Sequence, residues 1–306
     1  MLKAPPTPKG FRDIPPPLAK KRREVINKIA SCLEGAGFVP IDTPTIEFAE
    51  VLLGKYGEEA DRLIYQFKDR GGRKLGLRYD LTVPLARYVA TYNPPLPFRR
   101  YQIGQVFRGE NPQKGRWREF TQFDIDTVGS SDLVEDAKII AAVIKAVKVV
   151  GLDKPVMMIN DRKNFEGLDK DVITTIDKLD KIGDKGVTQE LVAKGVSEKE
   201  AVNTLKEIKN KKPTPDLEEI FKYLKQLGVR EDEYQFVPTL ARGLDYYTGT
   251  IFELKVGTYG LSVGGGGRYD NLIGMFVYPD KGGVKKQIPA VGFGLGLDRL
   301  LEILNL

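Results

Sequence analysis

Two glycine-rich stretches near the C-terminal end of the chain constrain its fold more than any other feature. In "AVGFGLGLDRL", which begins at Ala290, glycine recurs at every second position, as Gly292, Gly294 and Gly296. Successive side chains of a strand point to opposite faces, so one face of this strand carries no side chains. The stretch "VGGGGRYDNLIG", from Val263, adds four consecutive glycines. A bare strand allows another group to approach its backbone closely. That group is either a ligand or a tightly packed neighbour, and a flexible hairpin tip is a third interpretation for "GGGG".

The order of the remaining elements favours an α+β fold. Residues 18–36 have apolar side chains at helical spacing, and "FVPIDTPTIEF" follows as a predicted edge or interface strand with two prolines. Strand, glycine turn, strand and helix are then predicted over residues 62–92. Two more strands flank the polar loop "NPQKGRWR", and residues 132–150 form an amphipathic helix. Strands joined by hairpins, with helices alongside, predict a mostly antiparallel sheet flanked by helices rather than a doubly wound fold.

The composition changes near residue 161. From there to about residue 233 the chain is rich in Lys, Asp and Glu and shows helical periodicity, as in "DLEEIFKYLKQLG". We therefore predict a small helical insertion at residues 161–233 within a main domain formed by residues 1–160 and 234–306. The alternative is that these helices belong to the main core.

The residue types exclude several classes of chemistry. The chain has no histidine and a single cysteine, Cys32. It therefore has no histidine general base, no histidine-ligated zinc and no disulfide within the chain. The 48 Lys and Arg against 42 Asp and Glu give a formal charge of +6, which permits a polyanionic partner without requiring one. No run of eighteen apolar residues and no secretory signal is present, so we expect a cytoplasmic protein with no membrane contact.

Three further segments combine charged and polar side chains at predicted strand ends. "LARGLDYYTGTIFEL" sets Arg242 near Tyr246 and Tyr247, which suits a loop around a small polar ligand or a surface turn. In "LRYDLTVPLARY", either Asp80 or Thr82 can cap the following helix, which leaves the other for a ligand.

The third segment is "FRGENPQKGRWREF". Here Arg108 and Glu110 lie two residues apart on a predicted strand and would face the same way. The adjoining loop adds further cations, which are Lys114, Arg116 and Arg118. Such a hairpin suits a triphosphate or an RNA end, because arginine binds phosphate oxygens in pairs. The alternative is a solvated charged hairpin.

Together these segments resemble class II aminoacyl-tRNA synthetases, and most closely the histidyl-tRNA synthetases. "FRGE" with its basic loop and "REFTQFDID" resembles motif two, "GFGLGLDR" resembles motif three, and the helix ending at Gly37 with "FVPIDTPTIEF" resembles the dimer-forming motif one. "LARGLDYYTG" and "GGGGRYDNLIG" are similar to the two histidine-specific signatures of the family. The resemblance spans almost the whole chain in the correct order. It implies an ATP-dependent histidine–tRNA ligase that acts as a homodimer on L-histidine, ATP with Mg²⁺, and tRNA(His).

The resemblance also implies roles for particular residues. Arg242 and Arg108 would be catalytic, with Arg242 contacting the α-phosphate and the substrate carboxylate. The histidine-binding set would be Asp80, Thr82, Gln122, Asp126, Arg242, Tyr246, Tyr247 and Tyr269, with Asp126 accepting a hydrogen bond from the imidazole. Arg268 would help Tyr269 to close the pocket. The ATP-binding set would be Arg108, Glu110, Arg116, Arg118 and Arg299. No protein side chain is expected to be a dedicated metal ligand.

The chain departs from the family pattern at its end. Family enzymes carry an anticodon-binding domain after motif three, whereas this sequence stops at Leu306. We therefore expect a catalytic fragment, an engineered truncation or a stand-alone paralogue. One alternative is the non-catalytic regulatory subunit of ATP phosphoribosyltransferase in histidine biosynthesis, which resembles this family. A second is a synthetase-like RNA-sensing module of a larger protein. The presence of Arg108, Glu110, Arg242 and Arg299 favours a catalytic protein.

Overall fold

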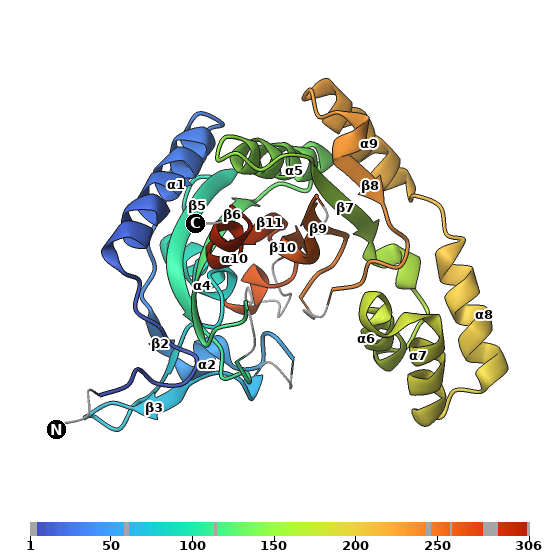
Figure 1. Cartoon of the computed structure of the whole chain (residues 1–306), viewed down its shortest axis with the longest axis horizontal. Coiled ribbons are helices and arrows are strands. Elements are labelled where there is room, and N and C mark those ends of the chain that lie inside the picture. Colours follow the sequence, from blue (N-terminus) through green and yellow to red (C-terminus); the bar gives the residue numbers. More distant parts are fainter. Residues whose placement is uncertain are drawn as a thin grey trace.

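The computed structural model describes residues 5–57, 61–112, 115–242, 246–257, 259–277 and 287–304. Its main sheet has the strand order β1-β5-β6-β11-β10-β9-β7-β8 (Figure 1). The pairs β1/β5 and β7/β8 are parallel, and the other pairs are antiparallel. The strands are β1 (Val39–Pro40), β5 (Phe98–Phe107), β6 (Glu119–Val128), β7 (Pro155–Asp161), β8 (Tyr234–Phe236), β9 (Thr250–Val256), β10 (Tyr259–Arg268) and β11 (Ala290–Gly296).

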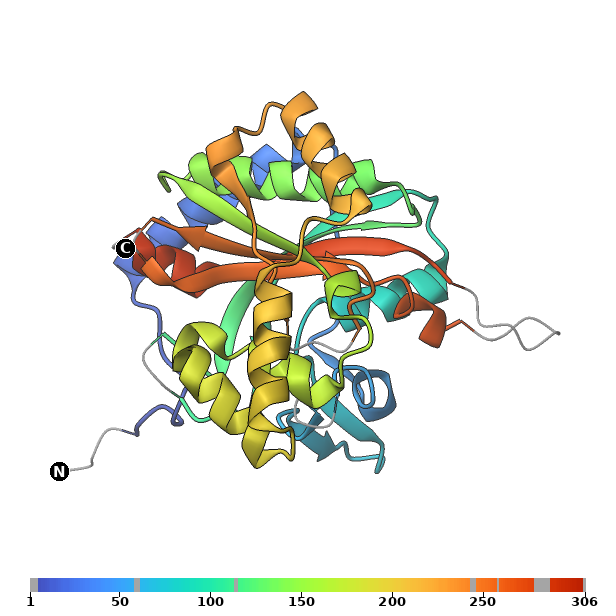
Figure 2. The same ribbon diagram turned by 90° about the vertical axis from the view of Figure 1, so that its right-hand side faces the viewer.

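Three helices cover one face of this sheet, as Figure 2 shows most clearly. They are α1 (Pro16–Glu34), α5 (Leu133–Lys148) and α9 (Pro215–Gln226). The apolar stripe of α1, with Val25, Ile29 and Leu33, joins the main hydrophobic core beneath α5. Burial of such stripes supplies most of the stability of amphipathic helices, since their intrinsic propensity is weak.

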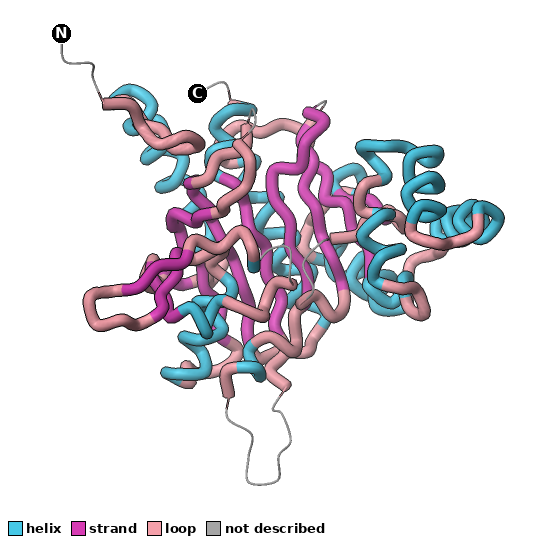
Figure 3. The backbone as a smooth tube through the Cα atoms, turned by 90° about the horizontal axis from the view of Figure 1, so that it is seen from below, coloured by secondary structure: helices cyan, strands magenta, loops and turns pink. Residues whose placement is uncertain are grey.

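On the other face of the main sheet, two groups of elements stand along the sides and leave the middle open. A small antiparallel sheet stands on one side, in the order β2 (Ile46–Phe48), β4 (Lys74–Leu77), β3 (Gln66–Lys68), with α2 (Ala49–Leu52) and α4 (Thr82–Tyr92) beside it. Helices α6 (Lys170–Ile176), α7 (Leu179–Ala193) and α8 (Glu198–Lys209) stand on the other side. Figure 3 shows the strands of the main sheet between these two groups. The arrangement leaves room for a site on this face.

Short elements complete the chain. The 3₁₀ turns are η1 (Arg162–Phe165), η2 (Glu231–Glu233) and η3 (Ile273–Met275), and α10 (Leu297–Ile303) follows β11 directly. Asp298 of α10 accepts a hydrogen bond from the backbone N–H of Thr121 at 2.7 Å and pairs with Arg12 of the N-terminal segment. These contacts fix α10, and therefore the neighbouring Arg299, to the hairpin of β5 and β6.

The α+β prediction is confirmed, and most predicted elements are present near their expected bounds. "FVPIDTPTIEF" differs, because it divides into β1, at the edge of the main sheet, and β2, in the small sheet. The hairpin-tip interpretation of "GGGG" is wrong, because Gly264–Gly267 pair with β9 on one side and β11 on the other. At residues 132–150 the helix begins after Asp132, whose side chain makes no capping hydrogen bond.

The helices of residues 161–233 divide among three hydrophobic clusters, and Ile176 of α6 and Ile208 of α8 join the cluster that also contains Tyr246 and Tyr269. Val187, Leu191, Ala201 and Leu205 of α7 and α8 form a hydrophobic cluster of their own. In contrast, α9 packs against α5 and contributes Leu217, Ile220 and Leu224 to the main core. The insertion at residues 161–233 stays a prediction. Within this region, α9 packs into the main hydrophobic core. No helix in the described residues is long and apolar enough to cross a membrane.

Candidate active site

A cavity of about 640 Å³ opens on the uncovered face of the main sheet. Glycines of β10 and β11 form part of its floor, with Gly264, Gly265, Gly292, Gly294 and Gly296 among the lining residues. Side chains from neighbouring segments lie over this floor. A Cβ atom at Gly265 would overlap the guanidinium of Arg242, and one at Gly294 would lie 2.6 Å from Nε2 of Gln122. The bare strands therefore admit functional side chains close to the backbone and leave space beside them.

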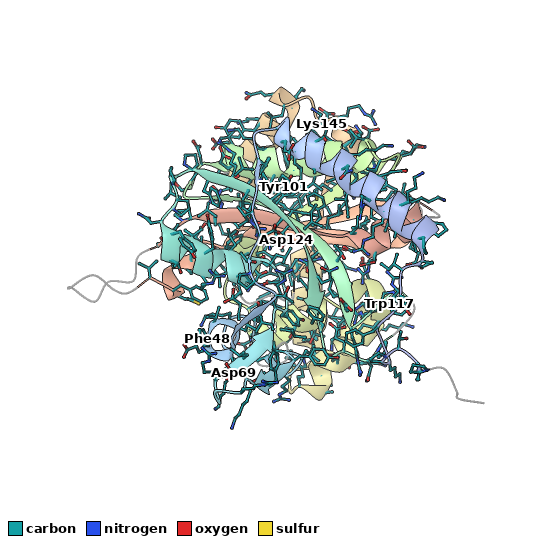
Figure 4. The ribbon with its side chains drawn as sticks, turned by 90° about the vertical axis from the view of Figure 1, so that its left-hand side faces the viewer. Phe48, Asp69, Tyr101, Trp117, Asp124 and Lys145 are labelled. Atoms are coloured by element: carbon teal, nitrogen blue, oxygen red, sulfur yellow. The ribbon has the colours of Figure 1, made fainter. Side chains whose placement is uncertain are left out.

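Part of the cavity lining is acidic and almost closed to solvent. Asp80, Asp124 and Asp126 are exposed by 3%, 3% and 2% respectively, and all three line the cavity. Figure 4 labels Asp124 near the middle of the molecule and Trp117 towards the end of the β5–β6 hairpin. Carboxylates rarely lie this deep unless they are paired or hydrogen-bonded. Three together indicate a site for a cationic or N–H-donating ligand.

Asp80 proves to be the residue that caps α4. Its Oδ1 accepts hydrogen bonds from the backbone N–H groups of Thr82 and Val83 at 3.1 and 3.0 Å, and from the hydroxyl of Tyr56 at 2.9 Å. The hydroxyl of Tyr246 lies 3.4 Å from its other oxygen. Burial raises the pKa of Asp80, and these hydrogen bonds oppose the rise. The Thr82 hydroxyl, 3.5 Å from Asp124 Oδ2, remains on the cavity side.

Asp126 lies between a phenol and a buried arginine. The hydroxyl of Tyr269 donates to Asp126 Oδ1 at 2.5 Å, and Arg100 Nη2 forms an ion pair with Oδ2 at 2.6 Å. Burial raises the pKa of Asp126, while Arg100 and Tyr269 act in the opposite direction. Sequence reasoning identified Asp126 and Tyr269 but missed Arg100, because "FRRYQ" alone does not say which arginine of the strand faces inwards.

Asp124 is a further residue of the site that sequence reasoning missed. Gln122 Nε2 donates to its Oδ1 at 2.8 Å. Burial raises the pKa of Asp124 to about 7, Arg100 opposes the rise, and the charges of Asp126 and Asp80 add to it. The alternation of β6 could have revealed it, since Gln122, Asp124 and Asp126 share one face of a strand.

The cavity also has a cationic part. Four arginines line it, which are Arg108, Arg116, Arg242 and Arg299. Burial lowers the pKa of Arg299, and the charges of Arg116, Arg108 and Arg242 lower it further. Arg299 therefore lies in the field of three other guanidinium groups, which is unfavourable for its charge in an isolated protein. A cluster of this kind suits a polyphosphate, which supplies the missing negative charge.

The local contacts hold these arginines in defined orientations. The Arg108 guanidinium lies 4.3 Å from the Tyr79 ring centroid and 5.0 Å from that of Phe120. Arg299 donates to the carbonyl of Ser262 at 2.8 Å. Arg116 pairs with Glu110 at 2.9 Å, and Arg242 pairs with Glu253 of β9 at 2.7 Å. Tyr246 and Tyr247 pack edge to face beside Arg242, with ring centroids 4.9 Å apart.

Three expectations about individual side chains need correction. β5 ends at Phe107, so Arg108 and Glu110 lie beyond the strand, although both still line the cavity. Arg118 is not among the lining residues, because its guanidinium donates to the backbone carbonyls of Glu110 and Lys9 at 2.9 and 3.4 Å. Arg268 points away from the cavity and forms a buried ion pair with Asp136 of α5. Arg268 is the last residue of β10, whereas the hydroxyl of Tyr269, the next residue, reaches Asp126 in the cavity.

Other functional positions lie outside the described residues or come from an unexpected segment. Lys114 of the motif-two loop and residues 243–245 of "RGLDYY" are outside the described ranges. Asp177, between α6 and α7, and Lys181, in the first turn of α7, line the cavity. Burial raises the pKa of Asp177, and Arg242 opposes that rise. The region predicted as an insertion therefore contributes to the wall of the site.

The geometry describes one cleft that is lined both by three buried carboxyl groups and by four arginines, including Arg242. An amino acid and a nucleoside triphosphate fit such a division of charge, because the α-ammonium group and the phosphates require opposite surroundings. A mostly antiparallel sheet flanked by helices, with motif-two and motif-three residues on neighbouring strands, defines the class II aminoacyl-tRNA synthetase architecture.

Comparison with known proteins identifies the family. The histidyl-tRNA synthetase family model matches residues 10–184 and 185–300. The histidine–tRNA ligase of Aeropyrum pernix is 40% identical over 96% of this chain and 73% of its own length. The crystal structure of histidyl-tRNA synthetase from Nostoc sp. PCC 7120 superposes with a TM-score of 0.81 at 29% identity, over 98% of this chain and 75% of that one. The chain belongs to the histidyl-tRNA synthetase family.

A further solved structure shares the fold. It is described as an ATP phosphoribosyltransferase regulatory subunit/histidyl-tRNA synthetase from Bacillus halodurans, and it superposes with a TM-score of 0.79 at 23% identity over 100% of this chain and 84% of its own. At this level of identity the likeness concerns the fold alone.

Proposed function

We propose that this chain activates L-histidine with ATP to give histidyl-adenylate and pyrophosphate, and then transfers the histidyl group to tRNA(His). The observation that carries the proposal is the one cleft that Asp80, Asp124 and Asp126 line together with Arg108, Arg116 and Arg299. It supports binding of histidine and ATP side by side, with the substrate carboxylate directed at the α-phosphate.

The acidic pocket would bind the amino acid. The α-ammonium group would lie among Asp80, Thr82 and Gln122, which all line the cavity. Because the Asp80 oxygens already accept several hydrogen bonds, Asp80 would act chiefly through its charge. The imidazole would donate a ring N–H to Asp126, with Tyr246, Tyr247 and Tyr269 packed around it. A ligand that lacks these groups would leave buried polar atoms unpaired, which is how such sites reject analogues by about 10⁴-fold or more.

The cationic region would bind the nucleotide. Arg108 and Arg299 would contact the α- and γ-phosphates, Arg116 the pyrophosphate end, and Glu110 the nucleotide that the loop covers. Arg118, through its bond to the Glu110 carbonyl, would position that loop instead of contacting ATP.

Adenylation itself needs no general base. A histidine carboxylate oxygen attacks the α-phosphorus, the bond from that phosphorus to the bridging oxygen breaks, and pyrophosphate leaves. Arg242 would contact both the attacking carboxylate and the α-phosphate, and would stabilise the charge that develops there. A chain without histidine can therefore perform the step.

Mg²⁺ would enter with ATP. It prefers oxygen ligands and is usually held by substrate phosphates together with one or two carboxylates. The cavity offers Glu110 and Glu253, so the donor set fits the ion. When bound, Mg²⁺ neutralises charge on the phosphates. Within the described residues no group of three or more Cys, Asp or Glu side chains is arranged to hold a metal by itself.

The active form would be a cytoplasmic homodimer. Val39 of β1 and Ile46 and Phe48 of β2 are exposed by 48%, 44% and 47%, and they lie in the segment that resembles motif one. Exposed apolar side chains of this kind support burial against a second copy. Sedimentation velocity of the chain, compared with a Phe48→Asp variant, tests this part of the proposal.

The activation proposal is tested by histidine-dependent exchange of pyrophosphate into ATP. Exchange that requires histidine and Mg²⁺ supports it. Histidine binding by calorimetry without any exchange would contradict it and would favour the regulatory-subunit alternative.

A further inference from the structure

Arg100 of β5 is the most deeply buried charged side chain near the site. It is 0% exposed, whereas its neighbour on the strand, Arg99, keeps 30% of its side chain exposed and pairs with Glu135 of α5. Arg100 does not line the cavity. It lies behind Asp126, its direct partner in the register of β5 and β6, and pairs with it at 2.6 Å.

The hydrogen bonding of Arg100 is incomplete. Nη2 donates to the carbonyl of Leu81 at 3.2 Å, but Nε and Nη1 make no hydrogen bond within the described residues. A buried guanidinium with unpaired donors is a poor way to stabilise a fold, since apolar side chains of similar volume serve equally well or better. Its retention is better explained by an effect on Asp126.

Asp126 needs a nearby positive charge to stay ionised, because its other surroundings disfavour a negative charge. The Asp80 and Asp124 carboxylates lie in the same pocket, and burial acts in the same direction. If Asp126 were protonated, one of its oxygens would carry an O–H and would donate a hydrogen bond. In the ionised form both oxygens accept hydrogen bonds, so either can accept from a ring N–H of the ligand. Tyr269 donates to Oδ1 and Arg100 pairs with Oδ2, so the two partners fix the plane of the carboxylate.

We propose that Arg100 is a positioning residue for amino-acid specificity, which holds Asp126 ionised and oriented to accept the ring N–H of the substrate. The inference rests on the proposed function, because it concerns the same pocket. Arg100 acts through Asp126 and touches neither histidine nor ATP.

The test is a double-mutant cycle on Arg100 and Asp126, read as the KM for histidine and the KM for ATP in pyrophosphate exchange. Arg100→Met should raise the histidine KM by about tenfold or more, the size expected for directly coupled residues, and leave the ATP KM within about twofold. In an Asp126→Asn background the same Arg100→Met change should alter the histidine KM by less than about threefold. Arg99→Met, on the adjacent position of the strand, is the matched control and should leave both KM values unchanged.

Two outcomes would overturn the proposal. One is an equal rise in both KM values, which would indicate a general structural role for Arg100. The other is that Arg100→Met raises the histidine KM by the same factor with Asp126 and with Asn at that position, which would show that Arg100 does not act through the Asp126 carboxylate. Failure of the proposed function is recognised separately, because the unmodified protein would then show no histidine-dependent exchange.

If Arg100→Met does not fold, Arg100→Lys and Arg100→Gln provide the same comparison. Lysine keeps the charge and should leave the histidine KM within about threefold of the unmodified protein. Glutamine removes the charge and should raise it by about tenfold or more. Equal values, or the reverse order, would refute the assignment.

Discussion

A methyl group added at Gly265 should disable the site without harming the fold. A Cβ atom there would lie 2.5 Å from Nη1 of Arg242 and even closer to Cζ and Nη2. Ordinary contacts between such atoms are about 3.5–4.0 Å, so the guanidinium must move by roughly 1 Å. Displacements of this size at a reacting centre cost about 10²-fold in rate, or about 2.7 kcal/mol in the activation free energy. Gly265→Ala should therefore lower the kcat of histidine-dependent pyrophosphate exchange by about 10²-fold.

The neighbouring glycine provides the control. A Cβ at Gly266 points to the other face and would meet backbone atoms of β11, including Phe293 Cα at 2.7 Å. Backbone in the middle of a sheet yields less easily than the tip of an arginine. Gly266→Ala should thus lower the free energy of unfolding by about 1–3 kcal/mol, measured by urea denaturation, whereas Gly265→Ala should not lower it. Normal kcat in Gly265→Ala, or equal losses of stability in both variants, would refute this account of the glycine floor.

Three further predictions concern single side chains of the site. Arg242→Ala should abolish pyrophosphate exchange while the circular dichroism spectrum and the unfolding midpoint stay normal; exchange retained in this variant would remove Arg242 from its assigned role. Asp126→Ala should weaken histidine binding far more than ATP binding in calorimetry, because the carboxylate serves the acidic pocket alone, and equal losses would contradict that assignment. Burial raises the pKa of Asp124 to about 7, so in the folded protein this carboxyl stays protonated where the unfolded chain ionises it. Its contribution to stability is complete below about pH 4 and is lost as the pH rises through 7. Asp124→Asn should therefore flatten the pH dependence of the free energy of unfolding between about pH 4 and 7, and an unchanged slope would show that Asp124 does not titrate there.

Much of the site was predictable because its residues lie on alternating strands or at the ends of helices, where the sequence indicates which way a side chain points. The glycine alternation of β11 correctly predicted a strand with a bare face. The carboxylate before α4 was predicted to be either its cap or a ligand, and the capping role of Asp80 agrees with the first. The family-specific segments around Arg242 and Tyr269 were brought to one cavity.

The parts that escaped prediction depend on partners distant in the sequence. Arg100 and Arg99 are adjacent and chemically identical, and only the register with Asp126 on one face and Glu135 on the other distinguishes them. Arg118 was misjudged because the sequence does not give the register of the loop. The Arg108 N–H donates to the Arg118 carbonyl at 2.9 Å, and in this register the Arg118 side chain points towards the N-terminal segment. Arg268 was misplaced because its buried partner, Asp136 of α5, is distant in the sequence.

The central claim is that this cleft activates histidine and no other amino acid. Its most direct test is the exchange of labelled pyrophosphate into ATP in the presence of Mg²⁺, measured with each of the twenty amino acids in turn. The account predicts exchange with histidine alone, since the pocket is expected to pair the imidazole N–H with Asp126. Exchange with a different amino acid, or histidine binding with no exchange at all, would contradict it.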